Sequence, residues 1–482
     1  MNRHTLLLLI SVAVPLGLSA AATPSDSLRY DRAPVYSDSV ATASFLRDGI
    51  PAAWQYTSEY SQPDPVSDKW WQSFRDPILD SLIARAEANN FNVAMALKRI
   101  DIARQQLNQT KAGYWPTLNA SAGWSISQNA GAVANPVAPS STTDYFSVGL
   151  QMNWEIDVFG RIRAGAKADK AAIDVSRADY DAVIVSLCAN VATTYMQLRT
   201  YQAQYNVAIE HIASQERILK IAQARFEAGI GDMLEVTQAR IVLMSTQATI
   251  PALESSIRTS ANALAVLTGE YPSALTPLLL KPAPIPSNPG MANPGIPAEL
   301  LRRRPDVVEA EMQVARYAAL VGVAKKDFLP TLSLTGSIAT SAHKINNLFG
   351  AHSLEYSVAP TLSWTVFDGL ARNYRTAEAK LNMEQSIDNY NLTVINAVEE
   401  VEDAISRYNA KVRESQILTG LMEESRKSLD LSLDLYKQGL TDFRNVADAQ
   451  MSYLQNENSF VESKAATLAA LVSIYKALGG GW

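Results

Sequence analysis

The 482-residue sequence predicts an α+β membrane protein made of long antiparallel α-helices and four β-strands. Three observations support this fold class. The chain repeats itself at an offset of about 210 residues, two regions of nearly 70 residues lack proline, and each half contains two segments of alternating apolar and polar residues. These patterns indicate a tandem duplication with one long helix and one strand hairpin in each half.

The composition excludes several classes of function. Lys and Arg number 42 against 48 Asp and Glu, a net charge of -6, so we expect no nucleic-acid partner. Cys188 is the single cysteine and the four histidines lack metal-ligand spacing, which excludes an intramolecular disulfide and a multi-thiolate metal site. Neither a P-loop nor a nucleophile elbow occurs, so we expect no enzyme activity and no cofactor.

The first 22 residues have the order of a secretory signal peptide. A basic end with Arg3 precedes an apolar run, and the run leads to Ala20-Ala21-Ala22. The run contains Pro15 and is shorter than the roughly 20 residues that span a bilayer. We therefore predict that the mature chain starts near Thr23, with an irregular segment over residues 23–69. No later segment has about 18 uninterrupted apolar residues, so we expect any membrane entry to use strands.

Four paired motifs define the duplication. Residues 114–118 recur as 328–332, 154–161 as 364–372, 225–232 as 435–442, and Leu267-Thr268-Gly269 as Leu478-Gly479-Gly480. The first structural repeat is thus 70–271 and the second is 297–482. The linker at 272–296 is dense in proline, which favours extended chain over helix or sheet.

Each repeat contains one predicted strand hairpin, at 116–157 and at 330–367. Small polar side chains alternate with apolar ones, as a water-filled lumen and a lipid face require, and Trp124, Trp154 and Trp364 interrupt the apolar faces. Soluble amphipathic hairpins are the alternative interpretation. Because four strands cannot close a barrel, membrane insertion would require several chains, two giving eight strands and three giving twelve.

The helices alternate with these hairpins in a regular order. Each repeat begins with a short helix, near 76–113 and 305–328, which leads into its strands. The long helices at 160–228 and 369–438 carry seams rich in alanine, which favours close packing between helices. A left-handed glycine and an aspartate N-cap then predict a tight turn into the return helices at 232–269 and 442–479.

Together these motifs resemble the outer membrane efflux proteins, the channel-tunnels typified by TolC and OprM. The resemblance rests on the aromatic-x-Pro-Thr-Leu strand starts, the Trp...Phe-Gly and Asp-Gly strand exits and the Gly-x-x-Asp turns, and it covers about residues 70–479. It implies a homotrimer in the outer membrane of a Gram-negative bacterium. Twelve strands would form one barrel surrounded by outer membrane lipid, and the coiled-coil helices would form a hollow periplasmic tunnel.

The resemblance also implies two protein partners, a periplasmic adaptor (membrane fusion) protein and an inner-membrane pump of the RND type. The chain departs from the most similar branch of the family in one respect. It lacks the lipobox cysteine that often follows the signal peptide, having Ala20-Ala21-Ala22 instead, so no lipid anchor is predicted.

The same resemblance places a periplasmic gate at the two helical tips. The constriction maps onto the second return helix at Arg444, Asn445 and Asp448, and the remaining gate residues are Tyr436, Thr441, Asp442, Asp232 and Glu235. Three-fold symmetry would repeat Asp448 as a carboxylate ring that attracts cations. The adaptor would contact the tips around Gly229, Gly231 and Gly439.

Structural roles remain open for the same residues. Asp232 and Asp442 fit simple N-caps, Asp232 with Glu235 fits a capping box, and Arg444 with Asp448 fits an exposed i,i+4 pair. Two other functions also remain open, a duct for one-step (type I) protein secretion and a secreted coiled-coil scaffold that forms no channel. Nothing in the sequence distinguishes drug efflux, metal efflux and protein secretion.

Overall fold

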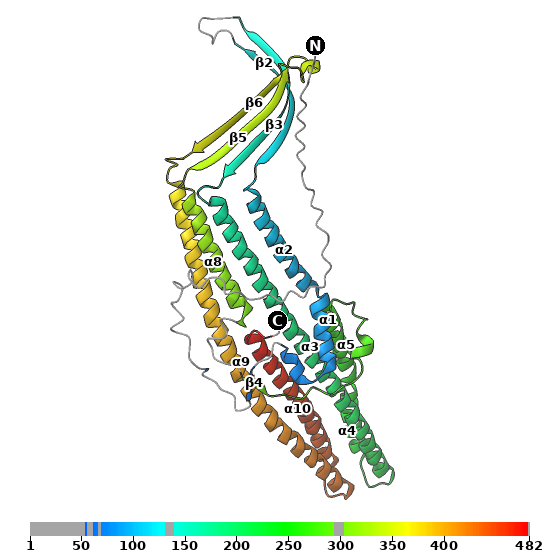
Figure 1. Cartoon of the computed structure of the whole chain (residues 1–482). Coiled ribbons are helices and arrows are strands. Elements are labelled where there is room, and N and C mark those ends of the chain that lie inside the picture. Colours follow the sequence, from blue (N-terminus) through cyan, green and yellow to red (C-terminus); the bar gives the residue numbers. More distant parts are fainter. Residues whose placement is uncertain (1–53, 55–60, 66–68, 131–138, 294–302, 481–482) are drawn as a thin grey trace.

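The computed structural model describes residues 54, 61–65, 69–130, 139–293 and 303–480. The predicted signal peptide lies outside the described residues, as does most of the segment at 23–69. The molecule is elongated, with a curved sheet at one end, helices that run away from it, and two helical hairpins that end at the opposite pole (Figure 1).

One four-stranded antiparallel sheet contains both predicted hairpins. Its strands are β2 (Thr117–Asn129), β3 (Ser141–Ile156), β5 (Thr331–Ala342) and β6 (Leu354–Ser363), in the order β2-β3-β5-β6. The short 3-10 helix η4 (Ile345–Asn347) lies between β5 and β6. The outer edges of β2 and β6 have no neighbouring strand among the described residues. Such edges expose unpaired backbone donors and acceptors.

The register of the sheet separates apolar from polar side chains. Directly paired residues of antiparallel strands point to the same face. One row of paired residues across the sheet is apolar and consists of Ala120, Leu150, Ile338 and Tyr356. The adjacent row is polar and consists of Asn119, Gln151, Ser337 and Ser357. The apolar face is open to its surroundings, with Leu118, Leu150 and Tyr356 exposed by 69%, 51% and 80%. An unburied apolar face of this size needs a non-aqueous partner.

The last strand ends earlier than the alternation predicted. β6 stops at Ser363, so Trp364 and Val366 follow the strand. The carbonyl of Thr365 accepts a hydrogen bond from the Arg372 guanidinium instead of one from a neighbouring strand. This contact turns the chain toward the following helix.

The helices of the first half are α1 (Pro77–Asn89), α2 (Phe91–Ala112), α3 (Arg161–Glu227), α4 (Met233–Gln247) and α5 (Ile250–Leu267), after the 3-10 helix η2 (Trp70–Phe74). Two expected helices are each split in two. The 76–113 helix breaks at Asn90, whose extended backbone and side chain cap α2 through the amides of Asn92 and Val93. The 232–269 helix breaks before Pro251, which cannot donate a hydrogen bond within a helix.

The second half has α8 (Pro305–Lys326), α9 (Ala371–Lys437) and α10 (Phe443–Ala477), and α9 has the same 67-residue length as α3. The linker and the N-terminal segment were predicted to be irregular, and this was wrong in part. The linker contains the one-turn helix α6 (Thr276–Leu279), whose Pro277 lies in the first turn where proline is tolerated. It also contains β4 (Met291–Asn293), which pairs in parallel with β1 (Ser61–Pro65).

Equivalent contacts recur in the two halves. Trp154 Nε1 donates to the Tyr114 carbonyl at 2.9 Å, and Trp364 Nε1 donates to the Phe328 carbonyl at 3.0 Å. The glycines that follow the return helices, Gly269 and Gly479, both have a φ of +71°. The left-handed glycines are therefore 210 residues apart, so Gly269 corresponds to Gly479, whereas the motif comparison had paired it with Gly480.

Two extended apolar clusters hold the helices together, and a small third cluster of Val307, Val394 and Ala397 joins α8 to α9. The larger lies mid-body and joins α1, α3, α5, α9 and α10 through residues such as Leu79, Val191 and Leu471. The smaller lies toward the tips and joins α3, α4, α9 and α10 around Val236 and Tyr436. Alanines of both long helices are buried in contact with other helices, among them Ala189 and Ala192 of α3 and Ala397 and Ala404 of α9, in agreement with the predicted alanine-rich seams. In the part of the chain that the structure describes, no helix is both long and apolar enough to cross a bilayer.

Candidate functional site

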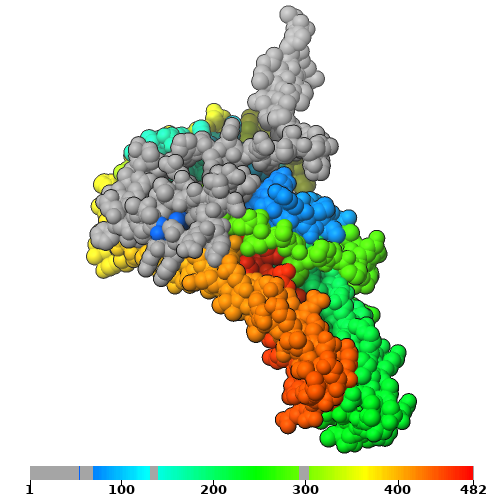
Figure 2. Space-filling model, turned by 90° about the horizontal axis from the view of Figure 1, so that it is seen from below, coloured from blue at the N-terminus to red at the C-terminus, as the bar shows by residue number. Residues whose placement is uncertain are grey.

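The two hairpin tips lie side by side at the pole opposite the sheet. Figure 2 shows this end of the molecule from below, with the first tip in green and the second in orange. Each tip turns at a left-handed glycine, Gly229 with φ +71° and Gly439 with φ +74°. Both glycines are exposed, and a Cβ built on either would meet nothing within 4 Å. These two turns therefore offer small, open surfaces. Gly231 differs, because it is half-buried and a Cβ there would meet Glu235 and Arg225 at 3.1–3.3 Å.

Tyr436 connects the second tip to the first. Its side chain is fully buried, and its hydroxyl donates to Glu235 Oε2 at 2.7 Å. The Arg225 guanidinium lies 4.7 Å from the centre of the Tyr436 ring, and Phe443 meets the same ring edge-on at 5.4 Å. Burial, together with the hydrogen bond to Glu235, raises the pKa of the Tyr436 phenol. The tyrosine thus stays protonated and can keep donating to the carboxylate.

The other residues expected at the constriction lie on the exposed face of α10. Arg444 Nε is 3.9 Å from Asp448 Oδ2, and the two side chains are 82% and 70% exposed. Asn445 Nδ2 donates to Thr441 Oγ1 at 2.6 Å. The structure thus brings the predicted residues together in two groups. One is the buried Tyr436–Glu235 contact between hairpins, and the other is an open polar surface of α10.

The two aspartates begin their helices in different ways. Asp232 Oδ1 accepts from the Leu234 amide at 3.3 Å, as an N-cap should, whereas Asp442 is the N-cap of α10 without a side-chain capping bond. The Glu235 carboxylate bonds Tyr436, so its contact lies between the hairpins and differs from that of a capping box. Asp442 is exposed at the tip.

Two contributors to this site were absent from the sequence-based prediction. Arg225 and Phe443 pack on Tyr436 but belong to different hairpins. Their positions next to the tip motifs were visible in the sequence. Their convergence depends on the packing of α3 against α10, for which a local pattern carries no signal.

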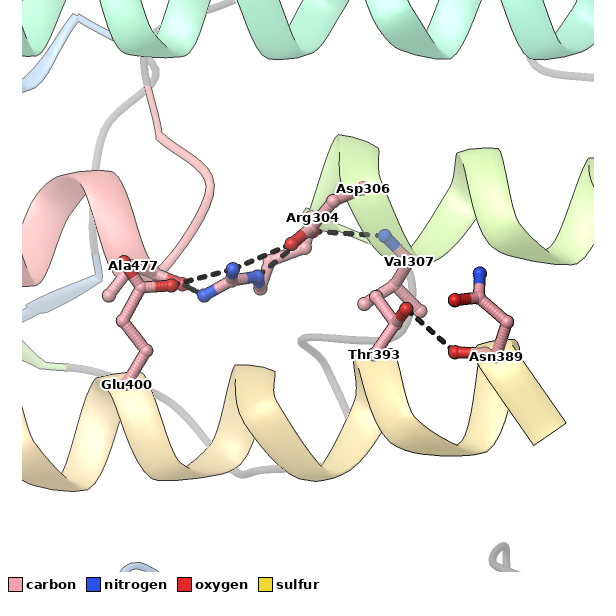
Figure 3. A network of polar contacts seen from close by, with 7 residues as sticks. All are labelled: Arg304, Asp306, Val307, Asn389, Thr393, Glu400 and Ala477. Carbon is pink, nitrogen blue, oxygen red and sulfur yellow. Dashed lines mark hydrogen bonds and ion pairs between the residues drawn. The ribbon is translucent and has the colours of Figure 1, made fainter.

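The far end of α10 is fixed by a buried arginine (Figure 3). Arg304, just before α8, donates to the Ala477 carbonyl at 2.7 Å and pairs with Asp306 and with Glu400 of α9, each at 2.7 Å. Burial opposes the charge of Arg304, but these hydrogen bonds and carboxylates outweigh it and raise the pKa of the guanidinium. The network ties three helices together at the end of the hairpin that bears the second tip.

The described residues contain no cluster of three or more His, Cys, Asp or Glu side chains that could hold a metal ion. A family model described as outer membrane efflux protein matches residues 82–270 and 296–480. The chain belongs to the outer membrane efflux protein family. This assignment confirms the resemblance seen in the sequence motifs, and the matched relatives are outer membrane efflux channels.

Similar proteins align along nearly their whole length. Pyoverdine export outer membrane protein OpmQ of Pseudomonas putida is 29% identical over 436 residues, which is 90% of this chain and 92% of the relative. Cation efflux system protein CusC of Escherichia coli O6:H1 is 28% identical over 420 residues, 86% of this chain and 88% of the relative. "Nodulation protein T" of Rhizobium leguminosarum bv. trifolii is 27% identical over 436 residues, 90% of this chain and 92% of the relative.

Solved structures agree with this relationship. The outer-membrane channel OprN superposes with a TM-score of 0.80 at 28% identity, covering 90% of this chain and 97% of OprN. A crystal structure of CusC superposes with a TM-score of 0.77 at 26% identity, covering 89% of this chain and all of CusC (100%).

Proposed function

We propose that this protein is the outer membrane channel-tunnel of a tripartite efflux system. Solutes delivered by an inner-membrane pump of the RND type through a periplasmic adaptor would pass along it and across the outer membrane. The observation that carries the proposal is the sheet, whose register gives one continuous apolar face and one face of small polar residues. These faces match lipid on one side and water on the other.

The open sheet edges support assembly from several copies. In lipid, the unpaired backbone groups of β2 and β6 need partners, and β6 of one copy can pair with β2 of the next. Three copies would supply twelve strands and the helices of a hollow tunnel. The equal lengths of α3 and α9, the recurring tryptophan contacts and the two matched segments of the family model support a duplicated chain in each copy.

We assign the gate to the hairpin tips. The Tyr436–Glu235 contact would hold the two hairpins of one copy together, and Arg444, Asn445 and Asp448 would face the narrowed pore. Thr441, Asp442 and Asp232 complete the polar tip surface. Gly229 and Gly439 offer the adaptor an open surface, and Gly231, half-buried against Arg225 and Glu235, completes the first tip. The exposure of Arg444 and Asp448 in a single copy supports a role in lining the pore.

Replacement of both Arg444 and Asp448 by alanine tests the gate. We expect a higher single-channel conductance in planar bilayers, because two charged side chains per copy leave the constriction. A matched control is Arg104→Ala with Asp101→Ala, an exposed ion pair of the same residue types on α2. An unchanged conductance in intact assemblies of the tip variant would refute the gate assignment.

The alternatives receive less support. The names of two relatives describe cation efflux and pyoverdine export, so they favour efflux over protein secretion or a scaffold. The relatives differ in what they transport, and a wide duct selects little. We therefore assign substrate choice to the pump.

A further inference from the structure

The two hairpins meet through a polar layer that lies between the two apolar clusters. On α3, the larger cluster ends at Leu198 and the smaller one begins at Ile218. Every buried α3 residue between them is polar except Ala208, namely Arg199, Thr200, Gln202, Gln204, His211 and Gln215. Facing this stretch, α10 has no fully buried residue between Gln450 and Val461. Two of these residues, Gln204 and His211, bond α10, whereas Arg199 and Gln202 bond the linker carbonyls of Lys281 and Leu279.

A histidine and a glutamate form the shortest link across this layer between α3 and α10. His211 is 6% exposed, and its Nε2 lies 2.7 Å from Glu457 Oε2. Gln204 Nε2 makes a second link, donating to Glu462 Oε1 at 2.8 Å. Along α3, His211 is about 27 Å from the tip glycine at 1.5 Å per residue. It thus forms a contact between hairpins well above the Tyr436–Glu235 contact.

A tyrosine lies beside the pair. The Tyr453 ring lies 4.8 Å from the His211 ring. Burial, followed by the charge of Glu457, raises the pKa of Tyr453, so the phenol remains a donor. The other charged groups around this cluster are Arg426 on α9 and Glu210 on α3.

The polar layer is not fully satisfied. Gln215 donates through Nε2 to Thr246 Oγ1 at 3.0 Å, but its buried Oε1 has no partner among the described residues. An unpaired buried acceptor costs free energy that an apolar side chain would avoid. Gln215 and Thr246 belong to the same hairpin, so this contact adds nothing between the hairpins. Because Ala208 is the one buried apolar residue of α3 in this stretch, the stretch gains less from apolar burial than the clusters on either side.

We propose that His211 and Glu457 form a pH-sensitive clasp that sets how readily the two hairpins of each copy separate. Histidine gains its positive charge within the range of about pH 8 to 5. A neutral imidazole donates a hydrogen bond to the Glu457 carboxylate, and the imidazolium adds a Coulomb attraction between opposite charges. Acidification therefore tightens the clasp, and alkalinisation loosens it. The inference rests on the proposed gate only for its effect on conduction.

Distances between spin labels at the two tips test the clasp without measuring conduction. Labels are placed at Ala228→Cys and Gln438→Cys, which are exposed tip positions, in a Cys188→Ala background of the full assembly in lipid. We expect the ratio of short to long tip distances to be about fivefold higher at pH 5.5 than at pH 8, the effect of adding one opposite charge to the pair. His211→Gln, which still donates to Glu457, should reduce this ratio change to less than about twofold.

Two further variants complete the test. Glu457→Gln keeps the histidine and removes the carboxylate, so it should also flatten the pH response. The exposed His352→Gln should leave the response as in the wild type. A wild-type protein whose tip distances do not change with pH, or a His211→Gln protein that keeps the full response, would overturn the proposal. A pH response in the tip distances without a conductance change would retain the clasp and count against the gate.

Discussion

Tyr436 and Phe226 occupy matching positions before the two tip glycines, yet only Tyr436 is buried. Phe226 is 44% exposed, whereas Tyr436 is fully buried in the tip cluster. The same position of the repeat is thus buried in one half and exposed in the other, because Tyr436 of the second hairpin points toward the first hairpin. The tyrosine hydroxyl gives this residue a hydrogen bond to Glu235 that phenylalanine could not make.

Removal of that hydroxyl should loosen the tips. Tyr436→Phe keeps the ring packing and deletes the bond to Glu235, so we expect the contact to weaken by about 1 kcal/mol and the single-channel conductance to rise. Because the phenol pKa is raised, the wild-type bond is fully present below about pH 10 and is lost as the pH rises through the raised value. Phe226→Leu is the control and should leave conductance unchanged. Equal conductance of Tyr436→Phe and wild type would remove Tyr436 from the gate.

Sequence patterns predicted which residues gather at the tips, but they could not predict the contacts between them. Gly229, Gly439 and Asp232 were predictable because a helix turn needs left-handed and capping residues close together in the chain. Tyr436 and Glu235 are 201 positions apart, and His211 and Glu457 are 246 positions apart. Such pairs depend on how whole helices pack, which local periodicity does not determine.

At the scale of elements, the end of the return helix in each half is hydrogen bonded to a residue at the start of α2 or α8. Asn90 Nδ2 donates to the Leu267 carbonyl at 2.8 Å, and Arg304 Nη1 donates to the Ala477 carbonyl at 2.7 Å. In each half a left-handed glycine follows, and a Cβ there would run into backbone, the Asn89 carbonyl oxygen for Gly269 and the Arg303 carbonyl oxygen at 2.8 Å for Gly479. Both the conformation and the close approach require glycine.

Alanine substitutions separate these two requirements. Gly269→Ala adds left-handed strain and a backbone overlap, so we expect a loss of about 3 kcal/mol in the free energy of unfolding. Gly439→Ala has a similar φ with open space around it and should cost only about 1 kcal/mol. Thermal unfolding followed by circular dichroism compares them. Equal melting temperatures for the two variants would contradict the close packing at Gly269.

The elements themselves were largely predictable, for a physical reason. A two-residue period defines a strand and its faces, and a long run without proline with a regular apolar seam defines a helix. The features that were not predicted are interruptions within helices and short elements such as α6 and β4. Asn90 interrupts the predicted first helix because its side chain caps the next one, and Pro251 interrupts the return helix through its missing donor.

For the whole molecule, the two sheet faces should respond oppositely to a charge. Leu150 and Gln151 are neighbours on β3, but Leu150 lies on the apolar face and Gln151 on the polar face. Leu150→Arg should destabilise the inserted state by about 2–4 kcal/mol, as for an arginine that faces lipid, whereas Gln151→Arg should be tolerated. The amount of assembled protein in the outer membrane fraction measures both. If assembled Gln151→Arg protein were missing from the outer membrane fraction while Leu150→Arg protein was present, the assignment of the two faces would be reversed.

The proposed assembly follows from the same sheet. A single copy leaves an apolar face and two strand edges exposed. The face is unfavourable in water, and the edges are unfavourable in lipid unless further copies pair with them. The barrel, the trimer and the tunnel therefore depend on one claim, that several copies assemble around a water-filled pore.

Conductance of the purified wild-type protein in a planar bilayer, with its mass determined in the same detergent, tests that claim most directly. We predict a mass of three copies and discrete, stable ion-conducting steps after insertion. A monomer that remains soluble without detergent and carries no current would contradict the account.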